Sequence, residues 1–150
     1  MKPQPLSWSD SVSLSLALAE EARSFDPSAI VAILRGGIYP ALVIAGRLGV
    51  EKVYTITLRK YSDEKPPSQV HREPVFLGGV VPNLGGDRVL IVDDVARTGS
   101  TLSKAKSIVM DKDAGEVRTA VLVLRSRGLS FMPDYYGIYM SACPLFPWER

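Results

Sequence analysis

Two adjacent carboxylates, Asp93 and Asp94, end an apolar run within the stretch VLIVDDVARTGSTL, residues 89–102. Neighbouring carboxylates repel each other, and burying both in the charged form is costly. A ligand that neutralises the pair therefore fits this place. Carboxylate oxygens accept hydrogen bonds from sugar hydroxyls and are hard ligands for Mg²⁺. The alternative is that one carboxylate is solvated while the other caps a turn.

A loop of hydroxyl residues around one glycine, TGST at residues 98–101, follows the acidic pair at the expected start of a helix. Backbone N–H groups at a helix N-terminus point outward, and the helix dipole favours an anion. Gly99 permits a close approach of the backbone, and the hydroxyls add donors. The loop therefore predicts a phosphate cradle, although an ordinary N-cap explains TGST alone equally well.

A second glycine-bearing turn, Arg35-Gly36-Gly37, follows the apolar run at residues 29–34. An arginine fork and exposed backbone suit an anion, while a simple tight turn explains this stretch by itself. Together the two turns and the carboxylates predict a ligand with a phosphate, a sugar diol and a metal. The motifs GxGxxG and GxxxxGK[ST] are absent, which argues against a dinucleotide site and a P-loop.

The elements that must position these residues alternate between strands and helices. The pattern predicts strands at residues 29–34, 53–58, 88–94, 117–124 and 135–140, and helices at 10–25, 40–47 and 101–112. Residues 59–74 form a long loop, and residues 75–81 form a short strand pair. Such alternation predicts an α/β fold with a mainly parallel twisted sheet and helices on both faces. Both glycine-bearing turns then meet at the carboxyl ends of the strands.

The bulk composition is that of an ordinary globular domain. The 150 residues suit one domain, and 46% of them are hydrophobic. A net charge of +2 is too small to indicate a nucleic-acid surface, and no apolar run is long enough for a membrane helix. The N-terminus has no signal-peptide pattern, and Cys143 is the one cysteine. We therefore expect a cytoplasmic protein that binds neither nucleic acid nor membrane.

The acidic pair followed by Thr-Gly-Ser-Thr resembles the phosphoribosyl pyrophosphate signature of the type I phosphoribosyltransferases. The stretch AILRGGIYPALVIAGRLGV, residues 32–50, is similar to the family's pyrophosphate loop and following helix. LSWSD near the start and FPWE near the end resemble the ends of the small xanthine–guanine enzymes. The resemblance implies a single domain over residues 1–150, a flexible loop at about 59–87 and a base-binding hood at about 126–150.

The resemblance also implies a role for each site residue. The catalytic residues are Asp93, Asp94 and Arg35, with Mg²⁺ at Asp94. The 5′-phosphate is wrapped by Ala96, Arg97, Thr98, Gly99, Ser100 and Thr101. The pyrophosphate lies at Arg35, Gly36 and Gly37, with a cis peptide bond between Arg35 and Gly36. The loop over the leaving group begins at Arg59, Lys60 and Tyr61. Arg125 reads the exocyclic oxygen of the base, and the hood contributes Leu145, Phe146 and Trp148.

Two departures from the family pattern bear on the base. The residue before Thr98, commonly acidic in the 6-oxopurine enzymes, is Arg97, which leaves the general base open. The usual aromatic platform of the hood falls at Cys143 or Pro144, so Phe146 is expected to stack on the base instead. We expect a homodimer or homotetramer that uses phosphoribosyl pyrophosphate and a 6-oxopurine: xanthine, guanine or hypoxanthine. The alternatives are an adenine enzyme and a non-catalytic sensor of phosphoribosyl pyrophosphate.

Overall fold

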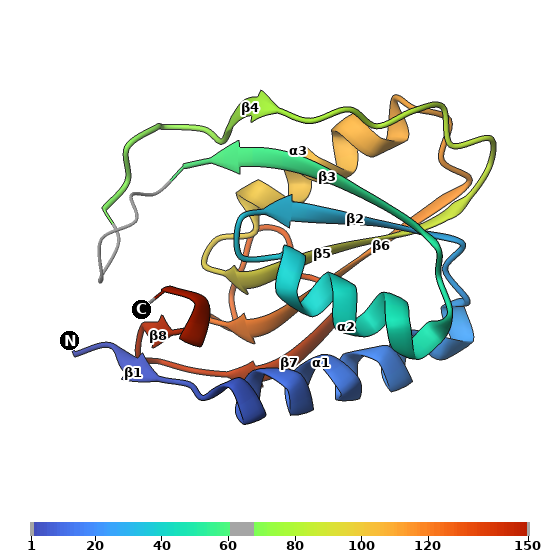
Figure 1. Cartoon of the computed structure of the whole chain (residues 1–150). Coiled ribbons are helices and arrows are strands. Elements are labelled where there is room, and N and C mark those ends of the chain that lie inside the picture. Colours follow the sequence, from blue (N-terminus) through green and yellow to red (C-terminus); the bar gives the residue numbers. More distant parts are fainter. Residues whose placement is uncertain (1, 61–67, 150) are drawn as a thin grey trace.

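A computed structural model describes residues 2–60 and 68–149, and its core is a six-stranded sheet in the order β4-β3-β2-β5-β6-β7 (Figure 1). Strands β2 to β7, apart from β4, run parallel, while β4 pairs antiparallel with β3. The strands are β2 Ala29–Leu34, β3 Lys52–Arg59, β4 Val75–Gly78, β5 Arg88–Ala96, β6 Glu116–Leu124 and β7 Tyr135–Tyr139. The predicted α/β fold with a mainly parallel sheet is thus confirmed.

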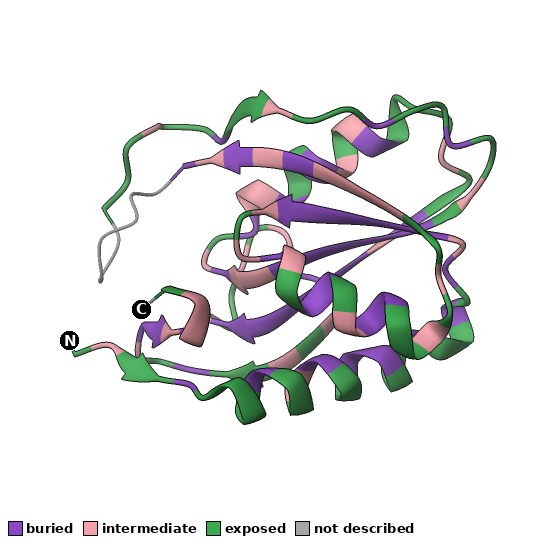
Figure 2. Cartoon of the chain, viewed as in Figure 1, coloured by how far each residue is buried: buried purple, intermediate pink, exposed green. Residues whose placement is uncertain are grey.

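Helices cover both faces of this sheet. Helices α1 (Trp8–Ala22) and α2 (Ile38–Leu48) pack on one face, and α3 (Ser100–Met110) packs on the other. The central strands are buried along most of their length, whereas each helix has buried residues on one face and exposed residues on the other (Figure 2). This is the reason that the central strands read as continuous apolar runs rather than alternating ones.

Helix α1 resolves a stretch whose apolar residues alternate like those of a strand. Ser7 and Asp10 form a capping box, in which each side chain accepts a hydrogen bond from the backbone N–H of the other, at 2.9 and 2.8 Å. Leu18 and Ala22 then face the core, while Val12 remains exposed. A short 3-10 turn, Arg23–Phe25, completes the predicted helical segment.

Three local expectations differ from the structure. Helix α2 begins at Ile38, two residues before Pro40, because the Gly37 carbonyl already accepts a hydrogen bond from Ala41 N. Residues 75–81 contain one strand, β4, and not a strand pair. Part of the expected flexible loop at 59–87 is therefore sheet, and Val81 and Leu84 lie in the core. Tyr61 and the rest of residues 61–67 lie outside the described residues.

Within the expected hood at about 126–150, β7 belongs to the central sheet, so the hood is confined to residues 144–149, which form a small second sheet with the start of the chain. Strand β1, Gln4–Pro5, pairs parallel with β8, Pro144–Leu145, and a 3-10 turn, Pro147–Glu149, follows. Gln4 N donates to the Cys143 carbonyl at 2.7 Å, and Leu6 N donates to the Leu145 carbonyl at 2.9 Å. None of the described helices is long and apolar enough to cross a membrane.

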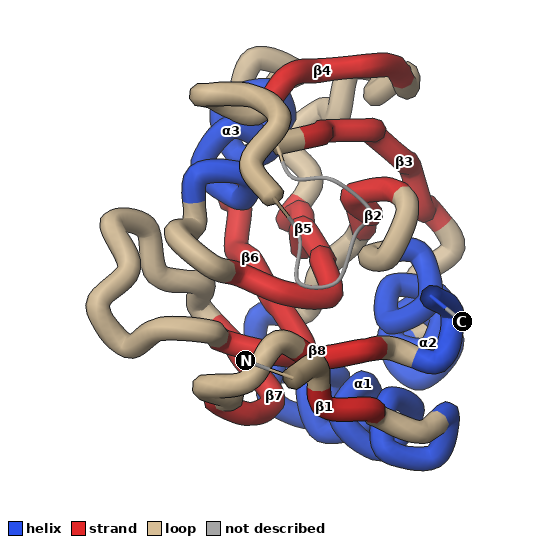
Figure 3. Tube along the Cα trace, turned by 90° about the vertical axis from the view of Figure 1, so that its left-hand side faces the viewer, coloured by secondary structure: helices blue, strands red, loops and turns tan. Residues whose placement is uncertain are grey.

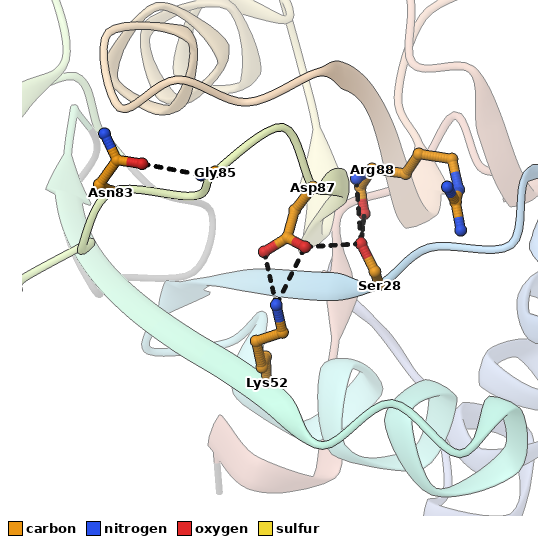
Figure 4. Close-up of polar contacts among 6 residues, drawn as sticks. All are labelled: Ser28, Lys52, Asn83, Gly85, Asp87 and Arg88. Carbon is orange, nitrogen blue, oxygen red and sulfur yellow. Dashed lines mark hydrogen bonds and ion pairs between the residues drawn. The ribbon is translucent and has the colours of Figure 1, made fainter.

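The amino ends of the central strands are held by a polar network around Asp87 (Figure 4). Lys52 Nζ donates to both Asp87 carboxylate oxygens, at 2.9 and 2.8 Å, and Ser28 Oγ donates to Asp87 Oδ1 at 3.0 Å. These hydrogen bonds, that of Lys52 first, lower the pKa of Asp87 below 3.8. The network connects the amino ends of β2, β3 and β5, which lie opposite the end of the sheet that carries the glycine-bearing turns.

We predict that Asp87→Asn destabilises the protein by about 1 kcal/mol at pH 7, since it removes an ion pair that is half exposed on the lysine side. Because the pKa of Asp87 is lowered in the folded state, its stabilisation is full above the ordinary value of 3.8. It is lost as the pH falls through the lowered value. Urea unfolding of wild type and variant at several pH values measures this. Asp111→Asn, at the exposed end of α3, is the control, and an equal loss in both variants would contradict the prediction.

Candidate functional site

The acidic pair lies at the carboxyl end of β5, where the sequence placed it. The Asp93 side chain is buried, and that of Asp94 is half-buried. Asp94 N donates to Asp93 Oδ1 at 2.8 Å. Burial, and then the nearby Asp94 charge, raise the pKa of Asp93 well above 3.8, and this hydrogen bond offsets only part of that rise. The pair is thus held in a conformation that favours partial protonation or a bound cation.

The turn between β2 and α2 lies directly beneath Asp94. A Cβ atom at Gly36 would come within 1.8 Å of Asp94 Oδ2, and one at Gly37 would come within 2.4 Å of the Val92 carbonyl oxygen. Gly37 is therefore required for the turn to approach β5 so closely, whereas the obstacle at Gly36 is the Asp94 side chain alone. The cis peptide bond joins Leu34 and Arg35, not Arg35 and Gly36 as expected. The expected position of the cis bond is therefore one residue after its actual position.

The TGST loop connects β5 to α3 with Gly99 in the left-handed region, at a φ of 87°. Gly99 is the N-cap residue of α3. Because glycine has no side chain, it does not form the side-chain cap that an ordinary N-cap residue provides. Thr98 Oγ1 lies 3.0 Å from Ser100 Oγ and accepts from Ser100 N at 3.2 Å. Hydroxyls and helix N–H groups are thus gathered where an anion is favoured.

A neighbouring loop fixes the outer side of TGST. Ser130 Oγ donates to the Thr98 carbonyl at 3.1 Å. A Cβ at Gly99 would lie 1.9 Å from the Phe131 carbonyl oxygen. Gly99 therefore serves the packing of two loops, and not only the approach of a ligand.

One cavity of about 730 Å³ brings most of the predicted residues together. Figure 3 looks towards the carboxyl ends of the strands, where β2 and β5 lie side by side with α3 and α2 on opposite sides of the sheet. The predicted residues that line the cavity are Arg35, Gly36, Arg59, Lys60, Asp93, Asp94, Ala96, Arg97, Thr98, Gly99, Thr101 and Trp148. The predicted residues outside this lining are Gly37, Ser100, Arg125, Leu145 and Phe146.

Lys60 approaches the TGST loop from the end of β3. Its side chain is largely buried, and its Nζ donates to Ser100 Oγ at 2.8 Å. The Lys60 carbonyl accepts from Val70 N and His71 N, at 2.8 and 3.1 Å. Lys60 is thus tied to the TGST loop by its side chain and to residues 70–71 by its backbone.

Two arginines and a thiol lie towards the hood. Arg97 Nη2 donates to Cys143 Sγ at 3.7 Å, and Arg125 Nη2 donates to the Ser141 carbonyl at 3.1 Å. Burial, and then the Arg97 charge, lower the pKa of Arg125. Arg125 Nε and Nη1 are buried with no hydrogen-bond partner among the described residues. Arg125 therefore lies outside the cavity lining, close enough to Arg97 for the two positive charges to repel each other.

The aromatic residues of the hood differ from expectation. Phe146 is fully buried in the core, so its ring has no surface with which to stack on a base. It stacks instead on Trp148, with ring centroids 4.7 Å apart, and Tyr39 also stacks on Trp148 at 4.7 Å. Tyr39 lines the cavity, and the sequence analysis missed it. The position of Tyr39 in the first turn of α2, four residues after Arg35, could have indicated that it lies beside the cavity.

This combination defines an α/β nucleotide-type site in which a phosphate-favouring loop, an acidic pair and an arginine turn share one cavity at the carboxyl ends of parallel strands. The chain belongs to the phosphoribosyl transferase domain family, which it matches over residues 14–149. Its fold is that of the type I phosphoribosyltransferases.

Similar proteins agree with this assignment. The chain is 31% identical over 132 residues to the bifunctional protein PyrR of Bacillus mycoides, covering 83% of this chain and 73% of that protein. A purine phosphoribosyltransferase of Pyrococcus horikoshii superposes with a TM-score of 0.82 at 31% identity, covering 100% of this chain and 96% of the other. The xanthine-guanine-hypoxanthine phosphoribosyltransferase of Helicobacter pylori has the same fold, with a TM-score of 0.75 at 18% identity and coverage of 99% and 93%.

We predict that Asp93→Asn stabilises the ligand-free protein increasingly as the pH rises. A raised pKa means that the folded state holds the Asp93 proton over a pH range in which the unfolded chain has lost it. Wild-type stability therefore falls as the pH rises from about 3.8 through the raised value, and the variant escapes that loss. Above this range the gain no longer changes with pH. Urea unfolding from pH 4 to 9 measures it, with Asp111→Asn as control. A pH-independent difference would count against the raised pKa.

Gly36→Ala is expected to displace the Asp94 carboxylate, because its Cβ would overlap Asp94 Oδ2. The neighbour is the end of a side chain that can rotate, so we expect a loss of stability of at most about 1 kcal/mol. Gly46→Ala is the matched control, since no atom lies within 4 Å of its Cβ in helix α2. There the alanine is expected to stabilise by about 0.5–1 kcal/mol. A crystal structure of Gly36→Ala with Asp94 unmoved would refute the packing argument.

Proposed function

We propose that this protein is a purine phosphoribosyltransferase. It transfers the 5-phosphoribosyl group of phosphoribosyl pyrophosphate to a 6-oxopurine and releases pyrophosphate. The observation that carries the proposal is the shared cavity, where the buried acidic pair, the TGST loop and Arg35 surround one space. A ligand with a 5′-phosphate, a ribose diol and a diphosphate carries the three groups that these features favour.

The substrate is proposed to lie with its 5′-phosphate on the TGST loop and its ribose over the acidic pair. Asp93 and Asp94 accept hydrogen bonds from the 2′- and 3′-hydroxyls, which fixes the sugar beside β5. Arg35 and the backbone around Gly36 face the diphosphate. This orientation follows the order of the elements across the cavity, from α3 through β5 to the β2–α2 turn.

The donor set also fits Mg²⁺. Among residues 2–60 and 68–149, no group of three or more His, Cys, Asp or Glu side chains is placed to hold a metal ion. Mg²⁺ commonly takes one or two carboxylates and fills its shell with substrate oxygens and water. Asp94, with Asp93 beside it, would hold the ion, which when bound supplies positive charge to the diphosphate.

Transfer breaks the bond between C1 of the ribose and the diphosphate oxygen, and a ring nitrogen of the base forms the new bond to C1 while the proton of the base passes to water. Positive charge develops on the ribose ring as the bond breaks. The Asp93 and Asp94 carboxylates favour that charge, and Arg35 favours the negative charge that accumulates on the leaving group. The protein forms no covalent bond to the substrate, so positioning supplies most of the acceleration.

The preferred base is inferred from the arginine side of the cavity. Arg97 occupies the place of the usual acidic residue, so no carboxylate there accepts the purine proton. Xanthine is the most acidic common purine and loses least from a missing base. The Arg97 guanidinium can donate to an exocyclic oxygen, which a 6-oxopurine offers at that position and adenine does not. The name of the Pyrococcus horikoshii relative, a purine phosphoribosyltransferase, also supports a purine.

A regulator that senses phosphoribosyl pyrophosphate is the second candidate. It is favoured by the likeness to a protein named bifunctional, the PyrR of Bacillus mycoides. Such a protein would bind phosphoribosyl pyrophosphate without forming nucleotide, so an assay for both events separates the two candidates.

The test is a nucleotide-formation screen with phosphoribosyl pyrophosphate, Mg²⁺ and guanine, xanthine, hypoxanthine, adenine, uracil or orotate. We expect xanthine or guanine to have the highest kcat/KM, at least about tenfold above adenine. Asp94→Asn is expected to lower turnover by about 100-fold or more while the protein stays folded. Adenine as best substrate would overturn the 6-oxopurine assignment, and binding of phosphoribosyl pyrophosphate without turnover on any base would favour the regulator.

A further inference from the structure

Lys60 carries an inference that rests on the proposed function and goes beyond the role expected from its place in the sequence. It was expected to help cover the leaving group, but its ammonium is directed to the TGST loop, 2.8 Å from Ser100 Oγ. We propose that Lys60 is the cation of the 5′-phosphate subsite. It moves its hydrogen bond from Ser100 to a phosphate oxygen when ligand binds.

The surroundings of the ammonium are those of an anion subsite. Ser100 is the first residue of α3, and its hydroxyl lies 3.0 Å from Thr98 Oγ1. The side chain of Lys60 is 9% exposed and also lines the cavity. At this burial its attraction to a phosphate is screened less than that of a surface lysine. A flexible stem and three rotatable donors allow the ammonium to change partner.

A cation is needed at this end of the cavity. A phosphate monoester carries a charge of about −1.5 to −2 near pH 7, whereas a helix N-terminus supplies only about +0.5. The carboxylates of Asp93 and Asp94, which line the same cavity, add repulsion. Arg97, the cation within the loop sequence itself, donates to Cys143 Sγ on the hood side. Because Arg97 is turned to the hood, Lys60 at the end of β3 supplies the positive charge beside the TGST loop.

The arrangement also separates two phosphate-binding tasks. Lys60 meets the loop before α3, while Arg35 belongs to the turn before α2, and these two helices cover opposite faces of the sheet. Lys60 therefore acts on the phosphate at C5 of the sugar, and Arg35 acts on the diphosphate at C1. Removing the Lys60 charge weakens one ligand group selectively.

The experiment measures binding of ribose 5-phosphate and of inorganic pyrophosphate by titration calorimetry. The proteins are wild type, Lys60→Met, Lys60→Gln and the exposed α3 control Lys104→Met. For both Lys60 variants we expect at least about tenfold weaker binding of ribose 5-phosphate, with pyrophosphate affinity within about twofold of wild type. Lys104→Met is expected to match wild type for both ligands. Thermal melting establishes which variants are folded.

The outcomes distinguish this inference from the proposed function. A wild-type protein that fails to bind ribose 5-phosphate overturns both. Folded Lys60 variants that bind ribose 5-phosphate as wild type does, or that lose both ligands equally, overturn the role of Lys60 alone. If neither variant folds, the rate of reductive methylation of Lys60 in the wild-type protein is measured by mass spectrometry with and without each ligand. Ribose 5-phosphate is expected to slow it and pyrophosphate to leave it unchanged, and the absence of protection overturns the inference.

Discussion

Repulsion between two adjacent carboxylates at the end of a buried strand is the constraint around which this protein is arranged. β5 lies between β2 and β6, so Asp93 has little access to water. The chain accommodates it with a backbone hydrogen bond from Asp94 and with a turn of two glycines beneath Asp94. Both devices keep the carboxylates in place. The negative charge of the two carboxylates can then attract a cation or accept hydrogen bonds from the hydroxyls of a ligand.

The two ends of β5 show opposite uses of a carboxylate. Asp87, just before the strand, has its pKa lowered by Lys52 and Ser28, and it stabilises the fold. Asp93, near its end, has its pKa raised by burial and by Asp94, and it costs stability. Stabilising ion pairs thus gather at the amino ends of the strands, while the energetically costly groups gather at the carboxyl ends. This division is expected where a fold supports a site that must remain reactive.

The sequence predicted most of the fold because the central strands are continuous apolar runs that end at charged or glycine residues. It predicted the acidic pair and the TGST loop for the same reason, since their positions follow from the end of β5. It missed β1 and β8, because a two-residue strand that contains proline has no periodicity to detect. It also missed the burial of Phe146 and the direction of Lys60, because both depend on contacts between segments far apart in the chain.

The hood shows how such distant contacts build one wall of the cavity. Strand β8 is held by β1, so the segment that ends in Trp148 is anchored to the start of the chain. The rings of Tyr39, Trp148 and Phe146 then stack in parallel, and Trp8 contacts both Tyr39 and Trp148. Trp148 is thus held in place by rings from α2 and from the core. Since Cys143 and Arg97 form the adjoining wall, that part of the cavity presents a thiol and a charged donor beside the stacked rings.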